Sequence, residues 1–295
     1  MSSSILVSVV IPTHNRAGKV LNAVNSVLNQ THTNLEVIII ADGCTDATIE
    51  VLKSLSDSRI KHVIETPGVG GGAARNFGLT RATGDYVAFL DDDDEWMPQK
   101  TTVQLSLLQK YPNTKLVSCS YQEVSETSSR SISCLEVITV EDLKYRNYPG
   151  SFSFCMMPRS ISMNLSINPE LRACQDWDMW MKVLLSAPKG ICRGVKESLV
   201  QYNIHEASRL STSSSGRISA RYQFLRSYWD ELSASQRDFQ LYELLKLKRS
   251  EYFSQLSYLT KVRMYFKALR HYQKSGYDQQ FRRYLSLGTK LLNLS

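Results

Sequence analysis

Short apolar runs alternate with segments of helical periodicity over roughly the first ninety residues. Three of these runs are rich in Val, Ile, Phe or Tyr and almost wholly apolar, as in strands buried on both faces of a sheet, whereas the run at residues 60–65 also contains Lys, His and Glu. The predicted strands are residues 5–11, 35–41, 60–65 and 86–90. The helices expected between them are residues 17–29, 47–55 and 73–82. This alternation predicts an α/β fold with a Rossmann-like wound sheet that is mixed but mostly parallel.

The ends of these elements carry recognisable signals. Pro12 is expected to end the first strand, because proline has no N–H to donate to a neighbouring strand. Thr45 or Asp46 is expected to cap the helix that follows the second strand. After Trp96 the pattern is weaker, with a Ser-rich surface loop expected at residues 123–133. The other expected helices are residues 99–110 and 174–185, and the other strands are residues 116–119, 153–157 and 199–203.

The last quarter of the chain differs from the rest in charge. Residues 211–216 consist of Ser, Thr and Gly and predict a linker, and residues 217–295 predict an α-helical extension of two to four helices. From residue 216 onward there are 15 Lys and Arg against 6 Asp and Glu, whereas the preceding residues are slightly acidic. This segment predicts an anionic partner, which is membrane lipid, nucleic acid or another protein.

The composition is typical of a cytosolic protein with a substantial core, since 42% of the residues are hydrophobic. No apolar stretch approaches the roughly 20 residues that span a bilayer, and no basic residue precedes the first apolar run. Neither a membrane span nor a signal peptide is therefore expected. The 6 cysteines form no C-x-x-C pair, so we expect reduced, mostly buried thiols rather than a zinc site or a disulfide scaffold.

Four consecutive aspartates, Asp91 to Asp94, directly follow the predicted strand at residues 86–90. Adjacent carboxylates repel one another and raise each other's proton affinity unless a cation is near. Hard oxygen ligands on a short turn suit Mg²⁺ or Mn²⁺. Open parallel sheets bind ligands beyond the carboxyl ends of their strands. The run therefore predicts a metal site, with a solvated acidic turn as the alternative.

A glycine-rich loop at residues 68–73 matches the pattern G-x-G-x-x-G/A and precedes a predicted helix. Such a loop suggests dinucleotide binding when it follows the first strand of a sheet, but this one follows the third. We expect instead that these glycines let a helix pack close to a ligand. The sequence contains no G-x-x-x-x-G-K-[ST] loop, so a P-loop nucleotide site is not expected.

Four segments together resemble the inverting family-2 glycosyltransferases with the A-type fold. They are VSVVIPTHNR, ADGCTDAT, GGAARNFGL with GDYVAFLDDDDEW, and RACQDWDMW, in that family's order. The resemblance covers about residues 5–210. It implies a catalytic domain at residues 1–210, with a nucleotide-binding half at about 1–97 and an acceptor half at about 98–210. Residues 217–295 would form a separate basic helical region.

The resemblance also implies roles for the nucleotide half. Asp42 would bind the base or ribose of a nucleotide sugar. Asp91 and Asp93 would hold the divalent ion. The other residues expected to line the nucleotide site are Pro12, Thr13, Asn15, Arg16, Arg75 and Asp92. For Arg75 a structural ion pair with the carboxylates is an equal alternative, and Asp46 is expected to cap a helix rather than contact a ligand.

In the acceptor half, Asp176 matches the catalytic base, which would take a proton from the acceptor hydroxyl. Gln175 stands where the family usually has Glu, which removes a negative charge beside the base. Trp177 would either stack on a sugar or pack in the core. His205 would be a third metal ligand or a phosphate contact, and Arg209 a phosphate clamp.

The main functional hypothesis is a metal-dependent inverting glycosyltransferase using Mn²⁺ or Mg²⁺. Its donor would be a nucleotide-diphosphate sugar, with UDP-sugars favoured. Its acceptor would be a glycan or lipid-linked hydroxyl in surface polysaccharide, lipopolysaccharide or capsule biosynthesis. The alternatives are a nucleotidyl- or phosphoryl-transfer enzyme on a similar sheet, and a non-catalytic scaffold that binds membrane or protein.

The basic helical region suggests a cytoplasmic protein that contacts the anionic inner face of the plasma membrane. The alternative is a helical cap with solvated lysines. No nucleic-acid-binding motif is present, so nucleic acid is not an expected partner.

Overall fold

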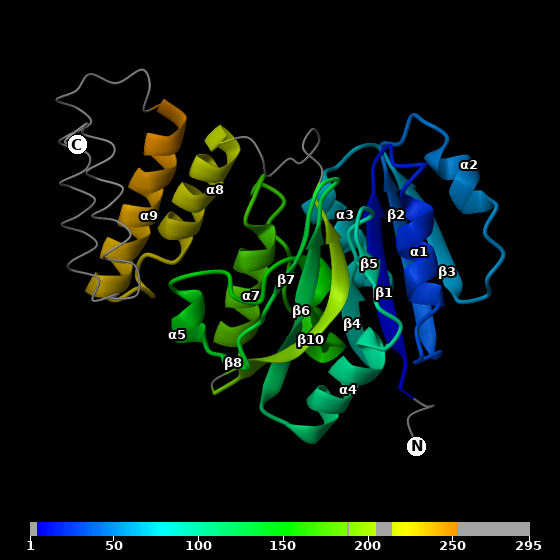
Figure 1. Ribbon diagram of the computed structural model, residues 1–295, viewed down its shortest axis with the longest axis horizontal. Helices are drawn as coiled ribbons and strands as arrows, with labels where there is room; N and C mark the ends of the chain where they lie inside the picture. The colour runs from blue at the N-terminus through cyan, green and yellow to red at the C-terminus, as the bar shows by residue number, and fades with distance from the viewer. Residues whose placement is uncertain (1–4, 188, 205–213, 253–295) are drawn as a thin grey trace. The chain divides into compact units, whose positions relative to one another are not determined.

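The computed structural model describes residues 5–187, 189–204 and 214–252 of the 295-residue chain (Figure 1). The chain divides into two compact units. The first comprises Met1–Glu170 with Gln175–Ala207, and the second comprises Leu171–Cys174 with Ser208–Ser295.

The first unit is built on one mixed, mostly parallel sheet with helices beside it, which confirms the predicted fold class. The strand order is β3-β2-β1-β4-β9-β6-β10-β5, with β7 paired to β6 and β8 paired to β10. Strands β1 to β4 are parallel neighbours, and β9 runs antiparallel to both β4 and β6. The strands are β1 (Val7–Thr13), β2 (Leu35–Asp42), β3 (Ile60–Thr66), β4 (Tyr86–Phe89), β5 (Glu95–Trp96), β6 (Thr114–Val124), β7 (Ser129–Ile132), β8 (Val137–Ile138), β9 (Met156–Pro158) and β10 (Ile191–Asn203).

The apolar runs at β1 and β2 form strands whose two faces are both covered, whereas the more polar β3 at the sheet edge is partly exposed. Every residue of β1 and of β2 is buried, so neither strand shows the polar alternation of a half-exposed sheet. Each fully buried Val or Ile contributes about 1.5–3 kcal/mol relative to exposure. The helices of this unit are α1 (Val20–Leu28), α2 (Thr48–Lys53), α3 (Gly71–Arg81), α4 (Lys100–Lys110), α5 (Val140–Leu143), α6 (Arg159–Ser162) and α7 (Gln175–Leu185), with a 3₁₀ turn, η1, at Phe152–Phe154.

Helix α3 packs unusually close to the sheet. A Cβ on Gly78 would stand 2.2 Å from Cγ1 of Val10 on β1, so no larger residue fits there without movement. At the start of the same helix, a Cβ on Gly72 would stand 2.7 Å from the Gln175 side chain. The glycines therefore bring α3 close to β1 and to the start of α7.

Two expectations about local structure are wrong. Pro12 does not end β1, which continues to Thr13 and pairs Pro12 with Ile40. The missing N–H of Pro12 faces the side on which β4 has already ended, so no sheet bond is lost. Residues 123–133 are not wholly a loop, because β7 pairs antiparallel with the end of β6. The strands of this exposed hairpin were not predicted because the segment is rich in serine, which is typical of loops.

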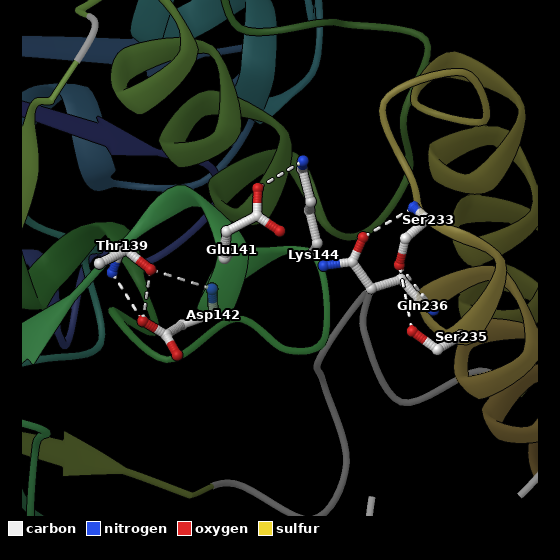
Figure 2. A network of polar contacts seen from close by, with 7 residues as sticks. All are labelled: Thr139, Glu141, Asp142, Lys144, Ser233, Ser235 and Gln236. Carbon is white, nitrogen blue, oxygen red and sulfur yellow. Dashed lines mark hydrogen bonds and ion pairs between the residues drawn. The ribbon is translucent and has the colours of Figure 1, made fainter. Parts of the chain in front are cut away.

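The second unit contains α8 (Ser214–Ser227) and α9 (Ala234–Tyr252) in its described part. Their contact is an apolar cluster of Leu225, Leu232 and Leu244, with Ile218 packed against it. Serine and glutamine side chains cap the start of α9 reciprocally: Gln236 N–H donates to the Ser233 hydroxyl, and Ser233 N–H donates to the Gln236 side-chain Oε1 (Figure 2).

The linker expected at residues 211–216 is corrected in part. Its last three residues form the first turn of α8, and residues 211–213 lie outside the described residues. Among the helices that the structure describes, none is long and apolar enough to cross a membrane.

Candidate active site

The site lies at the carboxyl edge of strands β1, β2 and β4. Because β1 lies between β2 and β4 and all three are parallel, their carboxyl ends meet at one edge. Thr13, Asp42 and Asp91 stand at or just after those three ends. Ligands of open α/β sheets bind at such an edge. The sequence-predicted nucleotide residues are thus brought together by the topology.

The carboxylate of Asp42 holds the glycine-rich loop. Its Oδ1 accepts from the Thr66 hydroxyl and from Val69 N–H, each at 2.7 Å, and its Oδ2 accepts from Gly70 N–H at 2.7 Å. Burial by itself would raise the pKa of Asp42, but these hydrogen bonds outweigh it and lower the pKa below its usual value. Asp42 is therefore an ionised anchor for the loop that leads into α3.

The loop after β1 is fastened to the loop after β2. The Asn15 Oδ1 accepts from Thr45 N–H at 2.7 Å and from Asp46 N–H at 3.3 Å, with Asn15 at a positive φ of 51°. Asp46 in turn accepts from Thr48 N–H at 3.0 Å at the start of α2. The capping residue of α2 is Ala47, so Asp46 is not the expected cap, although its carboxylate holds the first residue of the helix. Asn15 therefore joins the two loops through its side-chain oxygen. Its expected contact with the nucleotide stays a prediction.

Asp91 forms an ion pair with Arg75, which comes from the second turn of α3. The guanidinium also lies 4.4 Å over the ring centre of Phe152, where a cation is attracted by the aromatic face. Ser151 donates to the other carboxylate oxygen of Asp91 at 3.3 Å. The ion-pair alternative for Arg75 is thus the arrangement seen in this structure.

The remaining aspartates differ in their surroundings. Asp92 accepts from the Thr13 hydroxyl at 2.7 Å, and Asp93 lies 3.9 Å from Arg16. Burial raises the pKa of Asp92 to about 6, with a smaller contribution from the neighbouring Asp93 charge. Asp94 is buried, and its Oδ1 accepts from Asn203 N–H at 3.3 Å. The expected repulsion within the run is present, but burial is the larger effect on Asp92.

The carboxylates at positions 91 and 93 have the chemistry of a hard-cation site. In the described part of the chain, no group of three or more His, Cys, Asp or Glu residues is placed to hold a metal ion. Mg²⁺ is commonly held by one or two carboxylates together with substrate phosphates, so Asp91 and Asp93 fit an ion that arrives with a diphosphate. Arg75 and such an ion would share Asp91.

Asp176 lies in the first turn of α7, half-buried, with one carboxylate oxygen accepting Trp177 N–H at 2.7 Å. Loss of hydration raises the pKa of Asp176 to about 6, and the nearby Asp91 charge acts in the same direction. The hydrogen bond from Trp177 N–H and the positive charge of Arg75 oppose that rise. A carboxylate with this pKa is ionised at neutral pH and is still basic enough to accept a proton.

The other expected acceptor-side residues have distinct positions. Gln175 lies against Gly72 of α3. Trp177 is buried, and its indole N–H donates to the Leu143 carbonyl at 2.8 Å, so its burial supports core packing rather than sugar stacking. His205 and Arg209 lie outside the described residues.

Several residues near the carboxylates were not predicted. Asn147, Ser151 and Ser153 come from a segment with no strong periodicity, and Ser153 accepts from Asp91 N–H at 3.1 Å. Asn203, at the end of β10, donates to the Asp93 carbonyl at 2.7 Å. The sequence Asn-Tyr-Pro-Gly at residues 147–150 is a turn signal that could have drawn attention to this segment.

The sequence of this chain also matches a known protein family. The sequence profile of glycosyl transferase family 2 matches residues 8–162, which include the ends of β1, β2 and β4. The chain belongs to this family. It is accordingly a glycosyltransferase, as the ordered set of motifs predicted.

Two curated relatives of this glycosyltransferase are bacterial polysaccharide enzymes by name. WcaA of Escherichia coli K12, named for colanic acid biosynthesis, is 27% identical over 84% of this chain and 90% of its own length. TuaG of Bacillus subtilis 168, named for teichuronic acid biosynthesis, is 31% identical over 68% of this chain and 79% of its own.

A solved structure has a similar fold. S. aureus TarS 1–349 in complex with UDP-GlcNAc matches with a TM-score of 0.65 at 18% identity, over 92% of this chain and 81% of that chain. This likeness confirms the A-type glycosyltransferase fold.

Proposed function

We propose that this family-2 glycosyltransferase inverts the anomeric centre of a nucleotide-diphosphate sugar, with UDP-sugars as the first donors to test, and transfers the sugar to a hydroxyl acceptor. The main observation that supports this proposal is the position of Asp176, a half-buried carboxylate with a pKa of about 6, near the Arg75–Asp91 ion pair. The UDP-GlcNAc bound by the structurally similar TarS supports the choice of donor.

The proposed reaction is one in-line displacement. Asp176 accepts the proton of the acceptor hydroxyl as its oxygen attacks the anomeric carbon, and the bond to the diphosphate oxygen breaks. Attack from the side opposite the leaving group inverts the configuration. Asp176 then loses its proton to solvent. A raised pKa suits this role, because a more basic carboxylate drives proton transfer better.

The donor would lie along the edge formed by the first three loops. Asp42 fixes the glycine-rich loop and offers a carboxylate edge for the nucleoside, in the pocket expected to include Pro12, Thr13, Asn15 and Arg16. Asp92 closes this edge through its bond from Thr13. Arg75 would share its charge between Asp91 and the diphosphate.

We propose that Asp91 and Asp93 hold Mn²⁺ or Mg²⁺ together with donor phosphates, and His205 and Arg209 remain candidates for the same region. When bound, the ion would neutralise charge on the diphosphate leaving group. The expected catalytic domain is residues 1–210, and the acceptor is proposed to be a growing surface glycan or its lipid-linked precursor. The polysaccharide names of WcaA and TuaG support this acceptor class.

The basic region at residues 217–295 is proposed to hold the enzyme at an anionic membrane surface in the cytoplasm, where a lipid-linked acceptor would be presented. Its 15 Lys and Arg residues from residue 216 onward support that proposal, because each contributes about 1 kcal/mol near such a surface.

The test is thermal unfolding of the full chain with UDP, GDP, dTDP or CDP, each with and without Mn²⁺. A ligand at a hundredfold excess over its dissociation constant stabilises the folded state by about 2.7 kcal/mol. We expect UDP to raise the unfolding temperature most, and only with metal. Turnover should release a nucleoside diphosphate. Release of pyrophosphate would indicate nucleotidyl transfer instead, and no response to any nucleotide would favour a non-catalytic scaffold.

A further inference from the structure

The 3₁₀ turn η1 and its capping residue, Ser151, contact both members of the Arg75–Asp91 ion pair. Ser151 donates to an Asp91 carboxylate oxygen at 3.3 Å, and the Ser153 hydroxyl accepts from Asp91 N–H at 3.1 Å. Phe152 lies between these two serines, and the Arg75 guanidinium carbon lies 4.4 Å from the centre of its ring. One residue of the turn therefore contacts the cation, and the residues on either side of it contact the anion.

Hydrogen bonds do not hold the Arg75 guanidinium at every donor. Its Nη2 donates to Asp91, whereas its Nε is buried and has no hydrogen-bond partner among the described residues. The Arg75 side chain is only 11% exposed, so its contact with the Phe152 ring is largely shielded from water. The face of an aromatic ring attracts a cation most strongly where water is excluded. The ring therefore supplies an attraction that hydrogen bonds to this guanidinium do not.

Other aromatic residues fix the position of the Phe152 ring. The ring is buried, and it meets Phe89 and Trp180 edge to face, with ring centres 5.1 Å and 5.3 Å apart. Phe89 is the last residue of β4, the strand that leads to Asp91, and Trp180 lies on α7, the helix that carries Asp176. The ring therefore ties the guanidinium to the strand before the aspartates and to the helix of the proposed base.

We infer that Phe152 is a positioning residue for glycosyl transfer, and that its ring holds the Arg75 guanidinium where the cation serves both Asp91 and the donor diphosphate. This inference rests on the proposed role of Arg75 in diphosphate binding. An unrestrained arginine side chain has many rotamers, and ordering it at the moment when the donor binds would reduce the affinity. The ring orders it in advance. The alternative is that Phe152 serves only the core, in which it is buried.

Phe152→Leu and Phe154→Leu separate these two roles. Both substitutions remove a buried ring from the same turn, but the Phe154 ring is stacked on Tyr121 instead, with ring centres 4.3 Å apart. UDP affinity with Mn²⁺, measured by calorimetry, should fall about three- to tenfold in Phe152→Leu and stay within about twofold of the wild type in Phe154→Leu. Equal UDP affinities in the two variants would overturn the inference.

Fluorinated rings test the same contact without removing a core side chain. Ring fluorines withdraw electrons from the aromatic face, which weakens its attraction for a cation, while the shape of the ring changes little. UDP affinity should fall stepwise as position 152 receives phenylalanine with one, two and three ring fluorines, and the same series at position 154 should leave it within about twofold. An unchanged affinity throughout the series at position 152 would overturn the inference, even if Phe152→Leu failed to fold.

Arg75→Gln distinguishes failure of the inference from failure of the proposed function. UDP affinity should fall in Arg75→Gln, and Phe152→Leu should cause no further loss in that background, because the ring acts through the guanidinium. A full additional loss from Phe152→Leu in that background would overturn the inference and leave the proposed function intact. Unchanged UDP affinity in Arg75→Gln would contradict the proposed role of the arginine in donor binding, and the inference with it.

A second readout needs neither nucleotide nor turnover. The Nε–H signal of Arg75 in a proton–nitrogen NMR spectrum, assigned through Arg75→Gln, reports how fast the guanidinium rotates. Rotation should be faster by about threefold or more in Phe152→Leu than in the wild type, because the attraction of the ring face is lost, and it should be unchanged in Phe154→Leu. Equal rotation rates in all three proteins would overturn the inference, whatever their UDP affinities.

Discussion

The Arg75 guanidinium binds the Asp91 carboxylate while lying 4.4 Å over the Phe152 ring. The arginine and one expected metal ligand therefore neutralise each other beside a packed aromatic cluster. Phe152 contacts Phe89 and Trp180 edge to face, with ring centres 5.1 Å and 5.3 Å apart. A cation that binds Asp91 must displace this guanidinium or share the Asp91 carboxylate with it.

Replacing Arg75 with Gln should therefore have opposite effects on two ligands. Mn²⁺ binding in the absence of nucleotide should tighten, because Asp91 is released from its ion pair. Nucleotide-diphosphate binding should weaken by about tenfold, the value of one lost charge-assisted hydrogen bond. Electron paramagnetic resonance of free Mn²⁺ and calorimetry with UDP measure the two effects. Arg59→Gln, which breaks a surface pair with Asp57, is the control; weaker metal binding in Arg75→Gln would contradict the competition.

The proposed base should set the acid side of the pH profile. Asp176 has a pKa of about 6 and acts only when ionised, so kcat/KM should fall tenfold per pH unit below about pH 6. Asp176→Asn should abolish transfer and leave UDP affinity within about threefold, because the change does not alter the β1–β2 edge. Initial rates between pH 4.5 and 8 test this. Near-normal turnover of the Asn variant would remove Asp176 from the mechanism.

The same raised pKa predicts that acid, which lowers the activity, increases the contribution of Asp176 to the free energy of unfolding. A carboxyl group whose pKa is about 6 when folded and 3.8 otherwise stabilises the fold below pH 4 and loses that contribution as the pH rises through 6. At pH 8 the charged group is a cost, at most about 3 kcal/mol and less where water reaches it. Urea unfolding should show Asp176→Asn more stable than wild type at pH 8 and equal to it at pH 4.

The parts of the fold and site that the sequence predicts are those whose residues lie in regular, buried strands or at their ends. Strands β1 and β2 are buried at every position, so their almost wholly apolar runs predicted them clearly, and parallel order then placed Thr13, Asp42 and Asp91 at one edge. Asn147 could not be found in that way. Its position depends on a turn that the Trp180 indole of α7 holds through the Gly150 carbonyl, and a backbone contact of this kind leaves no periodic pattern in the sequence.

Local signals failed where neighbouring structure decided the outcome. Pro12 remains in its strand because it pairs with Ile40 of β2, while β4 on its other side has already ended. The hydrogen bonds that Asp42 accepts from the glycine-rich loop join β2 to the segment before α3, 27 and 28 residues further on, and no spacing rule predicts that pairing.

Removal of the second metal carboxylate should affect only metal-dependent binding. Asp93→Ala is expected to weaken UDP binding in the presence of Mn²⁺ by about tenfold, because one charged ligand to the ion is lost. Without metal, UDP affinity should be the same in variant and wild type. Glu126→Ala removes an equal charge from an exposed turn and should change neither value. Unaltered UDP affinity with Mn²⁺ would argue against Asp93 as a ligand.

The close packing of α3 can be tested with a pair of glycine substitutions. Gly78→Ala places a methyl group 2.2 Å from Val10 and should destabilise the fold by about 1–3 kcal/mol through overpacking. Gly18→Ala is the matched control, because a Cβ there meets nothing within 4 Å. Denaturant midpoints measure both. Equal midpoints for the two variants would show that α3 can move away from β1 at little cost.

Asp42 should prove to be an anchor as well as a nucleoside contact. Asp42→Asn replaces one accepting oxygen with an NH₂ group. That group must face either the Gly70 N–H or the pair of donors on Thr66 and Val69, which should lower the free energy of unfolding by about 1–3 kcal/mol. The loss should vanish as the pH falls through the lowered pKa of Asp42, because the wild-type carboxylate then takes up a proton. Thr66→Val removes a single donor and should cost less. If Asp42 also binds the nucleoside, Asp42→Asn will lose more UDP affinity than Thr66→Val, and equal losses would limit Asp42 to holding the loop.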